Sequence, residues 1–196
     1  TSIIKTDFHI PLLSIPKLLN IGIKQIPNPT KIKHIFDNEK NWKHVFKKNH
    51  INIGVSWQGS QTHGDDKKVE KFQRSFPFTS FNYLKGLKNI HLISLQKKFE
   101  NKMQLEKLEV PVLDLGEDFD NHEDAFIDTI NILKKLDLVI TCDTSLAHLA
   151  GSLNVPVWVG LKFVPDWRWG LYGKRTFWYP SMKLFRQKER NNWTEV

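Results

Sequence analysis

From residue 51 onward, short apolar segments alternate with segments of helical periodicity, and this alternation restricts the fold more than any other feature of the chain. Expected strands cover residues 51–57, 90–95, 110–115, 136–141 and 155–161, with a last strand at 182–185. Expected helices cover residues 79–87, 99–108, 124–135 and 145–153. Such alternation forms right-handed βαβ units, so we expect an α/β fold with a doubly wound, mostly parallel, Rossmann-like sheet.

The N-terminal part has a different pattern. Residues 1–26 are apolar and contain Pro11 and Pro16, the second of which is typical of the first turn of a short helix. Pro27-Asn28-Pro29-Thr30 is typical of a stiff linker, and a further helix is expected at 37–48. We therefore expect two parts, residues 1–36 and a main domain of residues 37–196.

Composition excludes several classes of protein. No run of about 18 apolar residues occurs, so no transmembrane segment is expected. Cys142 is the only cysteine, which excludes an intramolecular disulfide and a cysteine-rich zinc site. The first twenty residues lack the layout of a secretory signal, and a reducing cytoplasm is expected.

The chain is basic, with 29 Lys and Arg against 21 Asp and Glu and a formal net charge of +8. An excess of positive charge favours an anionic partner, whereas a solvated lysine-rich surface explains it equally well. The lysines occur as scattered pairs and no five-residue basic run exists, so charge alone does not indicate nucleic acid.

The most informative segment is 143–151, where a helix is expected to begin directly after a buried strand. Asp143 and Thr144 are residue types that precede helices, and the first turn from Ser145 presents backbone N–H groups and the positive end of the helix dipole. This arrangement suits a phosphate or pyrophosphate. His148 follows Thr144 by four residues and is expected on the same helix face. The alternative is a capped core helix with an inert, hydrogen-bonded His148.

Three other segments follow expected strands. Gly59 and Ser60 end the first strand and can approach an oxyanion, and the polar stretch 61–73 with Lys67 and Lys68 is either a phosphate-closing loop or a solvated insertion. Neither a Walker A motif nor a G-x-G-x-x-G fingerprint is present.

Gln96 and Lys97 follow the second strand and could meet a sugar, a base or a phosphate, or be ordinary surface residues. Trp167 could stack on a nucleobase or sugar, or wrap the end of the sheet. The acidic residues of 114–120 are expected in a surface loop, and no metal site is expected there.

Several motifs occur in order along the chain: GVSWQG at 54–59, RSFP at 74–77, SLQK at 94–97, DTSLAHLAG at 143–151, PDWRW at 165–169, WYP at 178–180 and FRQ at 185–187. Together they resemble the C-terminal part of the glycosyltransferase family 9 (heptosyltransferase-like) domain, often found behind tetratricopeptide repeats in bacterial proteins. Residues 7–16 resemble the last stretch of that family's N-terminal domain, so residues 1–36 would be its tail and a linker.

The resemblance implies the donor-binding half of a GT-B fold, in which two Rossmann-like domains flank the active site. It implies that Asp143, Thr144, Ser145 and His148, with Gly59, Ser60 and Lys67 or Lys68, bind the diphosphate of a nucleotide-sugar donor. Gln96, Lys97 and Trp167 would lie near the nucleoside or sugar. The implied reaction is inverting and metal-independent, with no cofactor, since a helix N-terminus and basic side chains stabilise the leaving diphosphate.

The resemblance leaves the acceptor open among a glycan, a lipid-linked sugar and a protein. No catalytic residue is assigned, because the family's presumed base lies early in the N-terminal domain, which is expected on another segment or chain. The expected location is the cytoplasm, with peripheral attachment to the inner membrane as an extension. A non-catalytic nucleotide-sugar binding or scaffold module is the main alternative, and a basic RNA-associated protein is a third hypothesis.

Overall fold

The computed structural model describes residues 7–29, 42–59, 74–97, 105–121 and 125–196. Its centre is a six-stranded sheet of β1 (Ile51–Ser56), β2 (Ile90–Ser94), β3 (Val112–Leu113), β4 (Leu138–Cys142), β5 (Val157–Leu161) and β6 (Met182–Arg186). The spatial order is β3-β2-β1-β4-β5-β6, and every described pairing is parallel. The α/β, doubly wound prediction is confirmed, with a sheet that is wholly parallel over the described strands.

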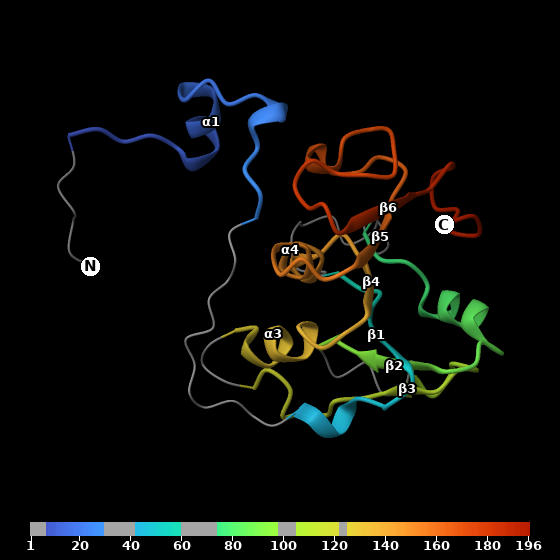
Figure 1. The fold of residues 1–196 in the computed structure, drawn as a ribbon. Coiled ribbons are helices and arrows are strands. Elements are labelled where there is room, and N and C mark those ends of the chain that lie inside the picture. Colours follow the sequence, from blue (N-terminus) through green and yellow to red (C-terminus); the bar gives the residue numbers. More distant parts are fainter. Residues whose placement is uncertain (1–6, 30–41, 60–73, 98–104, 122–124) are drawn as a thin grey trace.

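The strands are covered on both faces (Figure 1). Helices α3 (Ile127–Leu133) and α4 (Ser145–Ser152) lie on one face, and the 3₁₀ helix η4 (Phe78–Leu84) lies on the other. Shorter 3₁₀ helices are η3 (Trp42–Val45) and η5 (Trp167–Trp169). Burial on both faces explains why the strands are almost continuous apolar runs.

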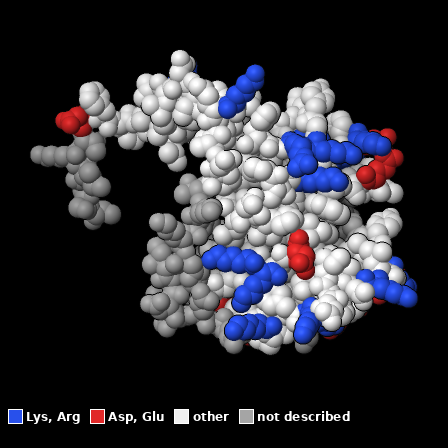
Figure 2. Space-filling model, in the orientation of Figure 1, with Lys and Arg blue, Asp and Glu red and all other residues white. Residues whose placement is uncertain are grey.

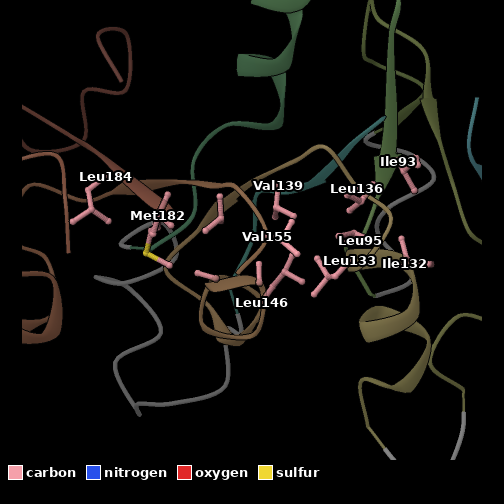
Figure 3. Packing of buried hydrophobic residues seen from close by; sticks show 14 of the residues in the cluster. Ile93, Leu95, Ile132, Leu133, Leu136, Val139, Leu146, Val155, Met182 and Leu184 are labelled. Atoms are coloured by element: carbon pink, nitrogen blue, oxygen red, sulfur yellow. The ribbon is translucent and has the colours of Figure 1, made fainter. Parts of the chain in front are cut away.

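The sheet separates two cores, and alternate residues of β2, β3 and β4 enter one or the other. On the side of α3 and α4, Val139 and Leu184 share a core with helix residues such as Ile132 and Leu146 (Figure 3). On the side of η4, a second core is built from strand and loop residues, including Val55, Trp57, Phe76, Phe81 and Leu92. Because β1 and β4 pair in parallel, their carboxyl ends lie at the same edge of the sheet, between the two cores.

Gly54 has a structural reason to be glycine. A Cβ there would lie 2.5 Å from Leu136 Cδ1 and 2.7 Å from Leu95 Cδ1, which is closer than atoms can approach. The two leucines thus pack directly onto the β1 backbone.

Several predicted elements need correction. The helix predicted at 79–87 is the 3₁₀ helix η4, which begins after Pro77 and ends before Gly86, whose φ is +87°. Its aromatic and polar residues are weak α-helix formers, which explains the tighter, shorter form. The strand predicted at 110–115 is reduced to Val112–Leu113 at the sheet edge.

The helix predicted at 124–135 is shortened at its start, because Phe126 has a φ of +70° and cannot belong to it. Most of the helix predicted at 99–108 lies outside the described residues, as does the predicted boundary at 36 and 37. Of the helix predicted at 37–48, the described part contains η3.

The N-terminal segment contains η1 (Leu12–Ser14), α1 (Ile15–Leu18) and η2 (Ile23–Gln25). Its large apolar side chains are exposed, among them Phe8, Leu12, Leu13 and Leu18. In Figure 1 this blue segment lies beside the sheet domain and adds no strand to it. Among the described residues, no helix is both long and apolar enough to cross a lipid bilayer.

Candidate functional site at the carboxyl ends of the strands

A cavity of about 230 Å³ opens where β1, β2 and β4 end. Strand order reverses between β1 and β4, so this is the topological switch point at which open parallel sheets bind ligands. Three strand ends supply most of its wall: Ser56, Gln58 and Gly59 at and after the end of β1, Leu95, Gln96 and Lys97 after β2, and Thr144, Ser145 and Leu146 at the start of α4, which follows β4.

The first turn of α4 opens into this cavity, and the side chain of its N-cap residue, Thr144, makes no capping hydrogen bond. Thr144 precedes the helix in an extended conformation, with φ −138° and ψ 172°. Its hydroxyl lies 3.3 Å from Thr141 Oγ1 and 3.4 Å from the Cys142 carbonyl oxygen, so it does not bond to the helix amides. The Ala147 amide donates to the Thr144 carbonyl oxygen at 3.0 Å, so the Ser145 and Leu146 amides, which precede any intrahelical acceptor, are the candidate donors to a ligand.

Gln96 joins the ends of β1 and β2. Its Oε1 accepts hydrogen bonds from Ser56 Oγ (3.0 Å), the Trp57 amide (3.2 Å) and the Gln58 amide (3.0 Å). Its Nε2 donates to the Gln58 carbonyl oxygen at 3.1 Å. Gln96 therefore lines the cavity and also holds the backbone that forms the neighbouring wall.

Gly59 continues this wall. Its amide donates to Ser75 Oγ at 3.1 Å, and its position next to Thr144 leaves room for a Cβ at ordinary contact distance. Ser60, Lys67 and Lys68 lie outside the described residues.

Lys97 supplies positive charge at the cavity. Its ammonium donates to the carbonyl oxygen of Asp120, and both residues line the cavity. Asp120 is buried, and one carboxylate oxygen accepts from the Asp128 and Thr129 amides at the start of α3. The surface-loop prediction is wrong for Asp120, because these amides draw its carboxylate inward.

Asp128 completes the support of this wall. Its carboxylate accepts from the Asp120 amide (2.9 Å) and from Trp42 Nε1 (2.7 Å), and it is fully buried. The pair of reciprocal carboxylate bonds fixes the loop between β3 and α3 against η3. Phe119, Phe126 and Thr129 complete the cavity, and sequence analysis identified none of these three. The one sequence signal for this wall was Asp120, an aspartate that stands shortly before the helix predicted at 124–135.

His148 lies one turn into α4 and faces the C-terminal segment. Its Nδ1 is 3.0 Å from the Tyr179 hydroxyl, and its ring stacks on Trp169 with centroids 4.9 Å apart. Burial, followed by the positive charge of Arg168, lowers the pKa of His148 below its ordinary 6.5. His148 is not among the described residues that line the cavity, whereas Thr144 is.

Charged residues surround His148. Asp143 is buried beside it and acts to raise the pKa of His148. Arg168 donates through Nε to Asp166 Oδ1 at 2.8 Å, which lowers the pKa of Asp166. Asp143, Asp166 and Arg168 thus place charged side chains close to His148, near the start of α4.

Trp167 lies farther out. Its side chain is 70% exposed and meets Trp178 edge-on at a centroid distance of 6.3 Å. Neither Trp167 nor Trp178 is among the described residues that line the cavity.

Two further features bear on ligands. Lys and Arg form several separate groups on the face shown in Figure 2, with few acidic side chains, so positive charge is spread over this face. The residues that the structure describes contain no group of three or more His, Cys, Asp or Glu arranged to hold a metal ion.

Similar folds occur in solved glycosyltransferase structures. E. coli heptosyltransferase WaaC with ADP has 15% identity and a TM-score of 0.47, covering 70% of this chain and 38% of that one. The glycosyl transferase family 9 from Veillonella parvula DSM 2008 has 15% identity and a TM-score of 0.48, covering 74% and 37%. WaaC with ADP-2-deoxy-2-fluoro heptose has 14% identity and a TM-score of 0.45, covering 70% and 37%.

This chain thus spans less than two fifths of each of those proteins. Identities and TM-scores this low transfer neither ligand nor activity to this chain. No protein-family model and no curated protein matches the chain.

Proposed function

We propose that this domain binds the diphosphate of a nucleotide sugar and forms the donor half of an inverting, metal-independent glycosyltransferase. One observation carries the proposal: the first turn of α4, which the Thr144 side chain does not cap, opens into the cavity at the switch point of the sheet. Backbone amides there, together with the nearby Lys97 ammonium, offer several hydrogen-bond donors to an anion. The motif resemblance supplies the substrate class.

In the proposed reaction, an acceptor oxygen attacks the anomeric carbon as the bond from that carbon to the diphosphate oxygen breaks. The electron pair of the broken bond stays on the diphosphate, and the acceptor proton passes to a base. Donors already aimed at the departing diphosphate stabilise its charge, since they need no reorganisation during the reaction. The Ser145 and Leu146 amides and Lys97 would fill this role without a metal ion. The base and the acceptor are not assigned.

Ser145 allows the amide contribution to be removed cleanly. It is the first residue of α4, where proline is well tolerated because its missing N–H has no intrahelical partner. A proline also restricts the preceding residue to extended conformations, and Thr144 already has one. Ser145→Pro therefore deletes one candidate donor with little effect on the helix, and Ser145→Ala is the matched control that keeps the amide.

The test is thermal unfolding with ADP, GDP and UDP, followed by calorimetry on the nucleotide that binds. A ligand at about 100 times its Kd stabilises a protein by about 2.7 kcal/mol, which gives a clear rise in melting temperature. Ser145→Pro should weaken binding about tenfold, as expected for a hydrogen bond to a charged group. Ser145→Ala should bind like wild type, and EDTA should leave binding unchanged.

Two results would overturn the proposal. One is the absence of a melting-temperature rise with all three nucleotides. The other is unchanged affinity in Ser145→Pro when circular dichroism shows an intact fold.

A further inference from the structure

A second hollow lies on the opposite face of the sheet from α3 and α4. It is a groove of about 590 Å³ between η4, the residue Glu109 before β3, and the tail of residues 191–194 that follows β6. In Figure 1, η4 and the C-terminus lie on the same side of the sheet. The groove shares no described lining residue with the cavity at the strand ends, so it is a separate place on the molecule.

Two aromatic side chains line the groove. Tyr83, on η4, is 77% exposed. Trp193, on the tail, is half-buried and packs against Phe76 with ring centroids 5.8 Å apart. One ring is thus anchored in the core and the other is held out by a helix, and each offers a flat apolar surface with a polar atom at its edge.

The rest of the groove is polar and almost uncharged. Its other described lining residues are mainly hydroxyl and amide side chains, such as Thr79, Asn82, Asn191 and Thr194. The one charged residue among them, Glu109, forms an ion pair with Lys85. A ligand that fits this lining has many hydrogen-bonding groups, little charge and some apolar surface.

Hydrogen bonds hold both sides of the groove. Asn82 Oδ1 accepts from the Glu109 amide at 3.0 Å, which ties η4 to the segment before β3. Asn192 donates through Nδ2 to Glu189 Oε2 at 3.2 Å, and its Oδ1 accepts from the Thr194 amide at 3.1 Å. Because these contacts exist without ligand, binding would require little ordering of the walls.

We propose that this groove is a binding site for a neutral oligosaccharide. The apolar C–H face of a pyranose stacks on an aromatic ring, and its hydroxyls pair with amide and hydroxyl side chains. A peptide fits less well, because the described lining residues include no aliphatic side chain apart from Pro77 and none of them belongs to a strand edge. Extended peptides are held mainly by strand edges or by pockets for apolar side chains.

The experiment is calorimetric titration of the full chain with linear hexasaccharides of glucose, mannose and N-acetylglucosamine. At least one should bind with a Kd of about 1 mM or tighter. Tyr83→Ala should weaken that binding about tenfold, and Tyr83→Phe should weaken it less than about threefold, because the ring remains. Tyr172→Ala is the control, since that tyrosine is 88% exposed and lies outside the groove.

The proposal fails if none of the hexasaccharides binds, if Tyr83→Ala binds as tightly as wild type, or if Tyr172→Ala causes the same loss. It also fails if an unstructured peptide binds in the groove and no hexasaccharide displaces it. Ser145→Pro separates this site from the proposed donor site, because it should leave oligosaccharide binding unchanged whatever its effect on nucleotides.

Discussion

Gly151 lies in α4 beneath the ring of Tyr179, and its replacement by alanine tests how the C-terminal segment packs on the helix. A Cβ at position 151 would lie 2.4 Å from Cγ, 2.7 Å from Cδ1 and 2.9 Å from Cβ of Tyr179. Atoms do not approach this closely, so the ring or the helix must move. The same ring carries the hydroxyl that lies 3.0 Å from His148 Nδ1, so this contact is lost if the ring is displaced.

Opposing contributions set the size of the effect. Alanine stabilises a helix interior by about 1 kcal/mol relative to glycine. Overpacking costs about 1–3 kcal/mol, and loss of the hydrogen bond between His148 and Tyr179 costs about 1 kcal/mol more. We therefore expect Gly151→Ala to lower the free energy of unfolding by about 1–3 kcal/mol.

The assay is urea denaturation of a double-mutant cycle. Tyr179→Gly removes all three of the contacting atoms, so Gly151→Ala in that background should raise the free energy of unfolding by up to about 1 kcal/mol. The sign of the effect thus depends on the presence of the ring. If Gly151→Ala stabilises the protein while Tyr179 is intact, the described packing of Tyr179 on α4 is refuted.

Two further predictions concern the site. Gln96→Leu removes the oxygen that accepts from both the Trp57 and Gln58 amides, and it should lower the free energy of unfolding by about 2–4 kcal/mol. Gln96→Glu keeps an oxygen acceptor and should lower the free energy of unfolding by less. Urea denaturation of both variants measures the difference. Because the folded-state pKa of His148 lies below its ordinary 6.5, protonation opposes folding, and stability should fall as pH drops below about 6.5. His148→Asn should reduce that fall in melting temperatures measured between about pH 5 and pH 8, and an unchanged profile would contradict the assignment.

Much of the fold follows from local pattern. The strands at 51–56 and 157–161 lie within the predicted segments, and α4 begins at Ser145 as predicted. These elements are long, apolar and bounded by clear signals, so neighbouring residues suffice to define them. Short elements were less predictable: the edge strand β3 and the 3₁₀ helix η4 depend on what packs against them.

The site shows the same division. Sequence analysis placed Gly59, Gln96, Lys97, Thr144 and Ser145 directly after expected strands, and all five line the cavity. Asp143, His148 and Trp167, also candidates, are not among its described lining residues. Their proposed contacts with a nucleotide sugar stay predictions. Gln96 also has a structural role that its sequence position did not indicate, as the acceptor for two β1-end amides.

Sequence by itself determined the order of strands and helices, and with it the edge of the sheet where a ligand would bind. Only the tertiary structure decided which side chains face that edge. Asp120 turns inward because the amides at the start of α3 draw its carboxylate, and His148 turns toward Tyr179, 31 residues later in the chain. Helix and strand periods follow from local backbone geometry, whereas the surroundings of a side chain are set by packing between segments far apart in sequence.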